Sequence, residues 1–395
     1  MRDVLDAILR WYSAGETFAL ATVVSTFRSA PRGPGAAMAV SAGGEVVGSV
    51  SGGCVEGAVY EAARQVMESG RPVLERYGVS DDDAFAVGLT CGGILHVFVE
   101  PVNRETFPEL AEVAAAVAGH RPVAVATTVT APGTDVAAPG TDTMAPAAST
   151  APADPGTAAA VLGGRRVIWP EHASGSLGAE GLDVAVDDDA RGMLAQGLTG
   201  ERHYGRRGER RMDEVAVFVQ SFAPPPRMLV FGAIDFAAAV ARVGRFLGYH
   251  VTVCDARGVF ATRKRFPDAD EVVVRWPHQY LRETEVDGRT AICVLTHDPK
   301  FDVPLLEVAL RTPAGYIGAM GSRRTHDDRM KRLREAGLTE AELDRLHSPI
   351  GLDIGARTPE ETAVSIAAEL TQHRWGGTGM PLKRTEGRIH GTPPE

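Results

Sequence analysis

Two of the four cysteines in this 395-residue chain stand beside pairs of glycines, where a ligand can approach a thiol closely. Cys54 follows Gly52 and Gly53 and precedes apolar residues at helical spacing, so we expect it at a helix N-terminus. There the helix dipole and unpaired backbone N–H groups stabilise a thiolate and can also hold a phosphate. Cys91 precedes a second glycine pair. The alternative for both is a small buried cysteine at a tight turn.

The spacing of the cysteines favours a soft ligand over structural zinc. The sequence has no CxxC pair and no neighbouring histidine pair at zinc-ligand spacing. A molybdenum dithiolene or the sulfur of a persulfide suits isolated thiols better, so Cys54 and Cys91 are our candidate metal-binding residues. Cys254 and Cys293 lie in apolar runs that predict strands, and we expect them in the core.

Arginines beside glycine-rich turns are candidates for binding an anion. Arg32 lies in the loop SAPRGPG, where it either pairs with a phosphate or carboxylate or is a solvated loop side chain. Gly321, Ser322, Arg323 and Arg324 enter a predicted helix and offer N–H groups and two guanidinium groups to a phosphate.

A dinucleotide-type turn follows the apolar run 228–232. Gly232 is in place, but Ile234 stands where the second glycine would let a pyrophosphate reach the backbone, and Asp235 would repel phosphates. Asp255 ends the next predicted strand, where a ribose-binding acid belongs. His297 follows a third strand, at the edge of a parallel sheet where ligands bind. The pattern predicts the fold more strongly than it predicts NAD(P) binding.

The elements that position these residues form two domains. Residues 18–101 and 123–221 share one order of motifs, which predicts a duplicated α+β unit in a domain over 1–222. The second copy has no cysteine, so the packing of the unit does not require the thiols. Residues 223–376 begin with a proline run and continue as alternating strands and helices, which predicts a doubly wound domain.

Two segments have compositions that bury little. Residues 130–160 are almost all Ala, Pro, Thr, Gly, Ser and Asp, and we expect a flexible extension of a hairpin loop. Residues 377–395 are rich in Gly, Pro and charge, and we expect a disordered tail.

Charge and hydropathy exclude several classes of protein. A formal charge of -10 argues against a nucleic-acid-binding protein, and no run of about 18 apolar residues predicts a membrane span. The first twenty residues indicate an amphipathic helix rather than a signal peptide, and four scattered cysteines do not make a disulfide framework. We therefore expect a soluble cytoplasmic protein.

The ordered motifs SAPRGPG, GSVSGGCVEG, LTCGG, LVFGAIDFAAAVA, VTVCDAR, LTHDPKFDVPLL, YIGAMGS and SPIGLDIGARTPEETAVSIAAE resemble the xanthine dehydrogenase accessory (XdhC/CoxI-type) family. The resemblance implies an N-terminal XdhC/CoxI domain and a C-terminal Rossmann-like domain. It also implies a factor that holds molybdenum cofactor, as molybdopterin or its dinucleotide, assists its sulfuration and delivers it to a molybdenum hydroxylase apoenzyme. A cysteine desulfurase and a second copy of the chain are further expected partners.

Two other functions compete with that role. The Rossmann-like domain and Asp255 are also typical of an NAD(P)-dependent oxidoreductase, although Ile234 and Asp235 count against it. Cys54 also fits a thiol-based redox enzyme or sulfurtransferase. No hydrolase triad or HExxH helix occurs in the sequence, so we favour a cofactor maturation factor without catalytic residues of its own.

Overall fold

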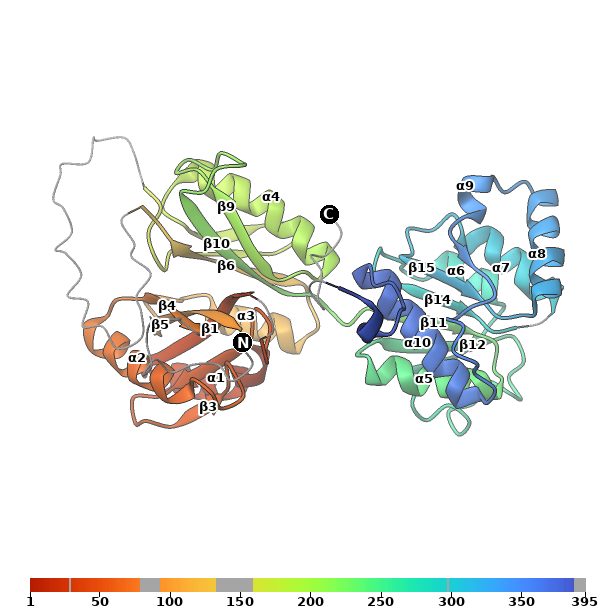
Figure 1. Cartoon of the computed structure of the whole chain (residues 1–395), viewed down its shortest axis with the longest axis horizontal. Coiled ribbons are helices and arrows are strands. Elements are labelled where there is room, and N and C mark those ends of the chain that lie inside the picture. The colour runs from red at the N-terminus through yellow and green to blue at the C-terminus, as the bar shows by residue number, and fades with distance from the viewer. Residues whose placement is uncertain (28–29, 79–92, 133–158, 297, 387–395) are drawn as a thin grey trace. The chain divides into compact units, whose positions relative to one another are not determined.

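The computed structural model describes residues 1–27, 30–78, 93–132, 159–296 and 298–386. The chain divides into two compact units, Met1–Pro224 and Pro225–Glu395 (Figure 1). The division falls inside the run Pro224-Pro225-Pro226, where each ring fixes φ and removes a backbone donor, so neither helix nor central strand continues across it.

The first unit begins with the short helix η1 (Arg2–Val4) and α1 (Leu5–Ser13), and it contains two five-stranded sheets. The first sheet is antiparallel, and its strands stand in the order β3-β2-β1-β5-β4. Helix α2 (Glu56–Ser69) packs its apolar residues on one face of this sheet. The strands are β1 (Phe18–Phe27), β2 (Ala37–Val40), β3 (Val46–Gly48), β4 (Val73–Gly78) and β5 (Ile94–Val102).

The second sheet repeats the first. Its order is β8-β7-β6-β10-β9, which is the same order once each strand is advanced by five. Helix α4 (Glu180–Gln196) occupies the position that α2 has in the first copy. The strands are β6 (Val123–Thr130), β7 (Arg165–Ile168), β8 (Ala173–Ser176), β9 (Gly200–Tyr204) and β10 (Val215–Phe222). The predicted duplication of one α+β unit is confirmed.

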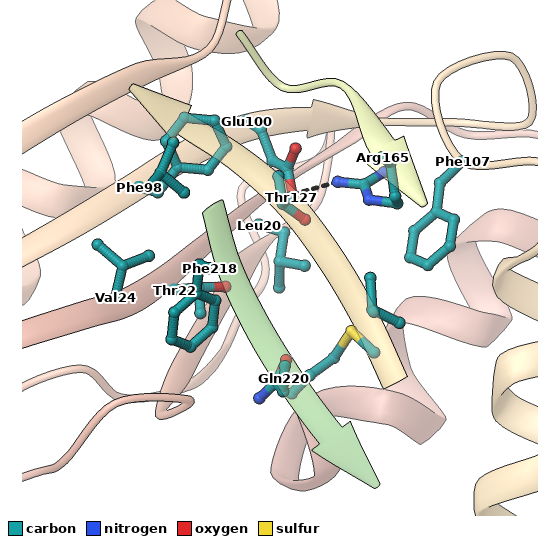
Figure 2. A pocket seen from close by; sticks show the side chains of 13 residues that line it. Leu20, Thr22, Val24, Phe98, Glu100, Phe107, Thr127, Arg165, Phe218 and Gln220 are labelled. Atoms are coloured by element: carbon teal, nitrogen blue, oxygen red, sulfur yellow. Dashed lines mark hydrogen bonds and ion pairs between the residues drawn. The ribbon is translucent and has the colours of Figure 1, made fainter. Parts of the chain in front are cut away.

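The two sheets pack against each other through a core of aromatic and aliphatic side chains that includes Val24, Phe98 and Phe218. A cavity of about 20 Å³ remains between them beside the buried ion pair of Glu100 and Arg165 (Figure 2). That volume suffices for one water molecule. Helices α1 and α3 (Leu110–Ala118) close a second core of the same unit.

The second unit contains one parallel sheet of order β13-β12-β11-β14-β15-β16. Counted within this unit, the order is 3-2-1-4-5-6, which is the order of dinucleotide-binding sheets. The strands are β11 (Arg227–Phe231), β12 (His250–Asp255), β13 (Glu271–Val274), β14 (Ala291–Val294), β15 (Tyr316–Ala319) and β16 (Leu346–His347). Cys254 and Cys293 are buried in β12 and β14, as the apolar runs predict.

Helices cover both faces of this sheet. Helices α5 (Asp235–Phe246) and α10 (Pro359–Trp375) share one core with it. The other core contains α6 (Pro277–Glu283), α7 (Pro299–Ala309), α8 (Arg323–Glu335) and α9 (Glu340–Leu343). The predicted doubly wound domain is therefore confirmed.

The two segments of biased composition are described only in part. Residues 133–158 of the insert lie outside the described residues, and the flanking strands β6 and β7 pair as an antiparallel hairpin. Within the expected tail, residues 377–386 are described and include the short helix η2 (Leu382–Arg384). Residues 387–395 lie outside the described part.

Candidate functional site

The connections that carry the candidate residues of the first unit start at one end of the first sheet. β1 ends where Phe27 pairs with Ile94, and β4 ends where Gly78 pairs with the same residue. β3 leaves the sheet beside the start of β2, where the Ser49 N–H donates to the Ala37 carbonyl oxygen at 3.0 Å. Arg32 and Cys54 therefore follow strands that end on one side. Cys91 and Gly92 lie outside the described residues, so the Cys54–Cys91 pair stays a prediction.

Cys54 lies on a glycine turn directly before α2, where the sequence places it. Its side chain is half-buried, and its N–H donates to Ser51 Oγ at 3.0 Å. Gly52 and Gly53 have φ values of 80° and 118°, and a Cβ at either position meets nothing within 4 Å. The turn requires glycine for its backbone conformation and not for lack of space. Both glycines leave the approach to the turn open.

The carboxylate of Glu56 occupies the backbone donors of this turn. Its oxygens accept from the N–H groups of Gly52, Gly53 and Val55 at 3.0, 2.8 and 3.2 Å. Burial alone would raise the pKa of Glu56, but hydrogen bonds from Ser49, Ser51 and the backbone lower it to about 2. From the sequence, these N–H groups are expected to be able to hold a phosphate, but in the structure they bind the protein's own Glu56 carboxylate. The physical reason is that Glu56, in the first turn of α2, folds back over the helix N-terminus.

Arg32 is paired within the chain. Its Nη2 lies 2.5 Å from Asp3 Oδ2, so a carboxylate already balances the charge expected to meet a phosphate. The surrounding loop lines an open pocket of about 370 Å³ together with Arg2, Thr199 and Gln220. Arg32 is therefore a loop side chain that is paired with the Asp3 carboxylate and also lines a pocket.

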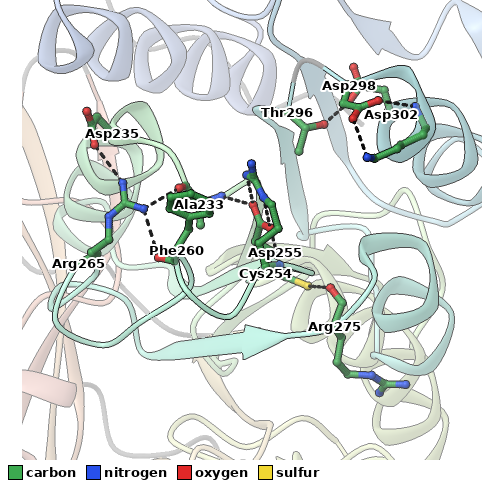
Figure 3. Close-up of polar contacts among 12 residues, drawn as sticks. Ala233, Asp235, Cys254, Asp255, Phe260, Arg265, Arg275, Thr296, Asp298 and Asp302 are labelled. Atoms are coloured by element: carbon green, nitrogen blue, oxygen red, sulfur yellow. Dashed lines mark hydrogen bonds and ion pairs between the residues drawn. The ribbon is translucent and has the colours of Figure 1, made fainter.

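The glycine turn of the second unit is tightly packed. Gly232 has φ of 111°, and a Cβ there would lie 2.9 Å from Thr296 Cγ2, so no other residue fits. Asp235, the first residue of α5, is largely exposed and pairs with Arg265 at 3.1 Å (Figure 3). The negative charge of Asp235, which the sequence predicts at the phosphate position, is thus compensated by the Arg265 guanidinium.

Asp255 ends β12 with both oxygens engaged (Figure 3). Oδ2 accepts from the Ala233 N–H at 2.8 Å and from Arg257 Nη2 at 2.8 Å, and Oδ1 accepts from Arg257 N and Nε. Burial opposes ionisation of Asp255, but these hydrogen bonds outweigh it and lower the pKa of the carboxyl group. A ribose hydroxyl would have to share or displace the Arg257 contacts to bind here.

The turn 321–324 caps a long helix. Ser322 is the N-cap of α8 and accepts from the Thr325 N–H at 3.1 Å, while Arg323 and Arg324 are exposed at the helix start. The start of α8 is thus open to an anion. Arg323 and Arg324 are candidates for binding it because of their position in the sequence and their exposure. His297 lies outside the described residues.

A buried ion pair beneath this turn is a feature that sequence reasoning missed. Arg329 Nη2 donates to Asp302 Oδ2 at 3.1 Å and to the Met320 carbonyl at 2.7 Å, and Nη1 donates to Ser348 Oγ at 2.9 Å. Thr296 donates to the other oxygen of Asp302. The cluster ties together the segments that follow β14, β15 and β16, where ligands bind in this fold.

The described part of the chain lacks two features. None of its helices is long and apolar enough to cross a membrane. No group of three or more His, Cys, Asp or Glu side chains there has the arrangement of a metal site.

Comparisons with known proteins agree with both units. Residues 11–78 match the family model of XdhC and CoxI, and residues 228–370 match that of the XdhC Rossmann domain. A Bacillus subtilis (strain 168) protein, named as a probable subunit of xanthine dehydrogenase, is 27% identical over 373 residues, covering 94% of this chain and 96% of that protein. The Escherichia coli (strain K12) protein called molybdenum cofactor insertion chaperone PaoD is 25% identical over 373 residues, covering 94% and 88%.

A solved structure from Bacillus halodurans, described as a xanthine dehydrogenase, matches with a TM-score of 0.61 over 93% of this chain and 95% of that chain. Its 24% identity supports the fold alone. The two matched segments include the Cys54 turn in the first unit and the Gly232 and Ser322 turns in the second. With both of its domain models matched in order along one chain, the protein belongs to the XdhC and CoxI family.

Proposed function

We propose that this protein binds molybdenum cofactor and delivers it to a molybdenum hydroxylase apoenzyme. The observation that carries the proposal is the similarity, over 94% of the chain, to a relative named as a molybdenum cofactor insertion chaperone. The similarity extends through both units and includes the Cys54 turn. A delivery factor needs a site that binds and then releases, which agrees with a half-buried thiol on a turn.

The chemistry of the donor set fits this ligand. The cofactor carries its own dithiolene sulfur ligands and supplies the client enzyme with its redox-active metal. One additional soft donor is therefore enough to contact it, and a cage of several protein ligands is not needed. Cys54 supplies that donor, and the open space beside Gly52 and Gly53 lets a ring system approach the turn.

The same thiol accounts for assistance with sulfuration, the finer part of the proposal. A cysteine desulfurase presents a persulfide, R–S–SH. The Cys54 thiolate attacks its terminal sulfur, the S–S bond breaks, and R–S⁻ leaves while Cys54 becomes a persulfide. Cys54 then holds the transferred sulfur as a persulfide at the turn where the cofactor is proposed to bind.

The second unit contributes an anion site in this proposal, at Gly321, Ser322, Arg323 and Arg324. Both arginines are exposed at the N-terminus of α8, where phosphate groups bind readily. Replacing both (Arg323→Ala with Arg324→Ala) should weaken binding of a phosphate-bearing cofactor by about 1.5–3 kcal/mol per lost contact. Unaltered affinity in the double variant would remove these residues from the site.

The test of the main proposal is reconstitution. The purified chain is incubated with molybdenum cofactor, separated from unbound material, and assayed for bound molybdenum and pterin. The loaded protein is then added to a molybdenum hydroxylase apoenzyme. We expect bound cofactor and faster activation than with the same amount of unbound cofactor. The proposal would be overturned if the chain retained no cofactor and activated the apoenzyme no faster than that control.

An NAD(P)-dependent oxidoreductase is the second candidate, because the sheet order of the second unit is that of dinucleotide-binding domains. Against it, Asp255 is held by Arg257 and the Ala233 N–H, and Ile234 replaces the glycine that admits a pyrophosphate. Titration with NADH and NADPH separates the two functions. Saturable binding of either would favour the oxidoreductase.

A further inference from the structure

The two repeats contain the same short segment before their helices. Gly48 and Gly175 both have φ of 78°, and a Cβ on either would lie 2.3–2.4 Å from a carbonyl oxygen of the adjacent strand. An acid follows eight residues later in each copy, Glu56 in the first and Asp183 in the second. These features are shared, so they belong to the scaffold of the repeat.

The acid binds the same partners in both copies. Ser49 Oγ donates to Glu56 at 2.6 Å, and Ser176 Oγ donates to Asp183 at 2.8 Å. The N–H of the next residue also donates to the acid in each, at 3.2 Å in the first copy and 2.8 Å in the second. The serine–carboxylate contact is therefore structural, and it does not by itself indicate a functional site.

The first copy adds contacts that surround Cys54. One oxygen of Glu56, Oε2, accepts from the N–H groups of Gly53 and Val55, the residues on either side of the thiol. Ser51 Oγ donates to that oxygen at 2.6 Å and accepts the N–H of Cys54 itself at 3.0 Å. Glu56 thus binds the N–H groups before and after Cys54 directly, and it holds the Cys54 N–H through Ser51.

We propose that Glu56 is a positioning residue for the Cys54 thiol, which fixes the turn that presents the sulfur and withholds the N–H groups of the helix start from it. This inference rests on the proposed function, in which Cys54 contacts the cofactor. Two consequences follow. Loss of the carboxylate misplaces the sulfur for cofactor, and it also loosens the turn, so that a reagent in solution reaches the sulfur more often.

The test compares Glu56→Gln with the matched control Asp183→Asn in the full chain. Alkylation by iodoacetamide is followed at each cysteine by mass spectrometry at one fixed pH, and retention of molybdenum cofactor is measured beside it. We expect Cys54 in Glu56→Gln to react about fivefold faster, because the turn that holds the sulfur loses its carboxylate partner and opens more often. Cofactor retention should fall at least threefold. Asp183→Asn should alter neither readout.

Cys254 and Cys293 report unfolding within the same experiment, because burial raises the pKa of each thiol to about 12 and keeps both protected in the folded protein. Faster alkylation of Cys254 and Cys293 as well as Cys54 marks a misfolded variant, and Glu56→Asp then replaces it, since that variant keeps the charge and shortens the reach. For Glu56→Asp we expect lowered cofactor retention, because the shorter side chain holds the turn less well, and unaltered retention would overturn the inference.

The inference and the proposed function fail in different ways. An unchanged Cys54 alkylation rate in a folded Glu56→Gln variant overturns the inference, whether or not cofactor retention changes. If the wild-type chain retains no cofactor, the proposed function fails, and the alkylation rate still decides whether Glu56 holds the turn that presents the thiol.

Discussion

The two repeats of the first unit share one backbone plan and use the same turn in opposite ways. The position of Cys54 in the first copy corresponds to Gly181 in the second, where a Cβ would lie 2.3 Å from the Arg207 carbonyl oxygen. At this position the second copy is therefore closed by the backbone of the connection between β9 and β10 and can carry no side chain. The first turn is open and carries a thiol. In the proposed function, the second copy is scaffold and the first copy carries the chemistry.

Replacing the thiol should give the largest effect. Cys54→Ser keeps the small polar shape at the helix start but removes the soft sulfur, so cofactor retention and apoenzyme activation should fall at least tenfold. Because Cys54 is not part of the fully buried core, the melting temperature should change by no more than about 2 °C. Thermal unfolding and the reconstitution assay measure both. A serine variant that activates the client normally would mean that the two turns differ only in packing.

A matched pair of glycine replacements tests whether the second turn is closed. Gly57 and Gly181 are each the second residue of their helices, α2 and α4. A Cβ at Gly57 meets nothing within 4 Å, so Gly57→Ala should be neutral or stabilise by up to about 1 kcal/mol. Gly181→Ala forces backbone apart and should destabilise the protein by roughly 2–3 kcal/mol. Urea unfolding of both variants checks this, and equal stabilities would remove the contrast.

The comparison also explains how much the sequence could predict. The duplication is readable because both copies keep strand patterns and motif order, and the doubly wound unit is readable because apolar runs alternate with helical patterns. The two-residue strand β16 (Leu346–His347) carries too little pattern to be predicted.

The contacts within the sites were harder to predict. The sequence places Cys54 at a helix start, but it does not say which groups take the N–H donors there. The shared spacing from Gly48 to Glu56 and from Gly175 to Asp183 was the available signal. Arg329 gave almost no signal, because α8 is dense in charge and only Met330 and Leu333 mark its inward face.

Acid unfolding sharpens the contrast at Glu56. Its folded-state pKa is lowered to about 2, so the carboxylate contributes stability above its ordinary pKa of 4.5, and that stability is lost as pH falls from about 4.5 to about 2. Solvent screening of this partly exposed group limits the contribution to about 1–2 kcal/mol. Glu56→Gln should therefore lower stability at pH 7 and flatten its decline in this range. Urea midpoints at pH 7, 4 and 3 test this, and parallel declines for the variant and wild type would contradict it.

The smallest effect is expected from shortening the connection between β6 and β7, which is much longer than the connection between β1 and β2. Deleting residues 132–156 leaves nine residues between β6 and β7, the same number that joins β1 to β2. The strand register is fixed outside the deletion, by pairs from Ala124–Ile168 to Thr127–Arg165, and by the Thr128 N–H bond to the Gly164 carbonyl at 2.9 Å. Because loop-closure entropy changes slowly with length, the free energy of unfolding should change by no more than about 1 kcal/mol, in the stabilising direction. Urea unfolding of the deletion variant measures it. A loss above about 2 kcal/mol would mean that the second repeat depends on its long connection in a way that the first does not.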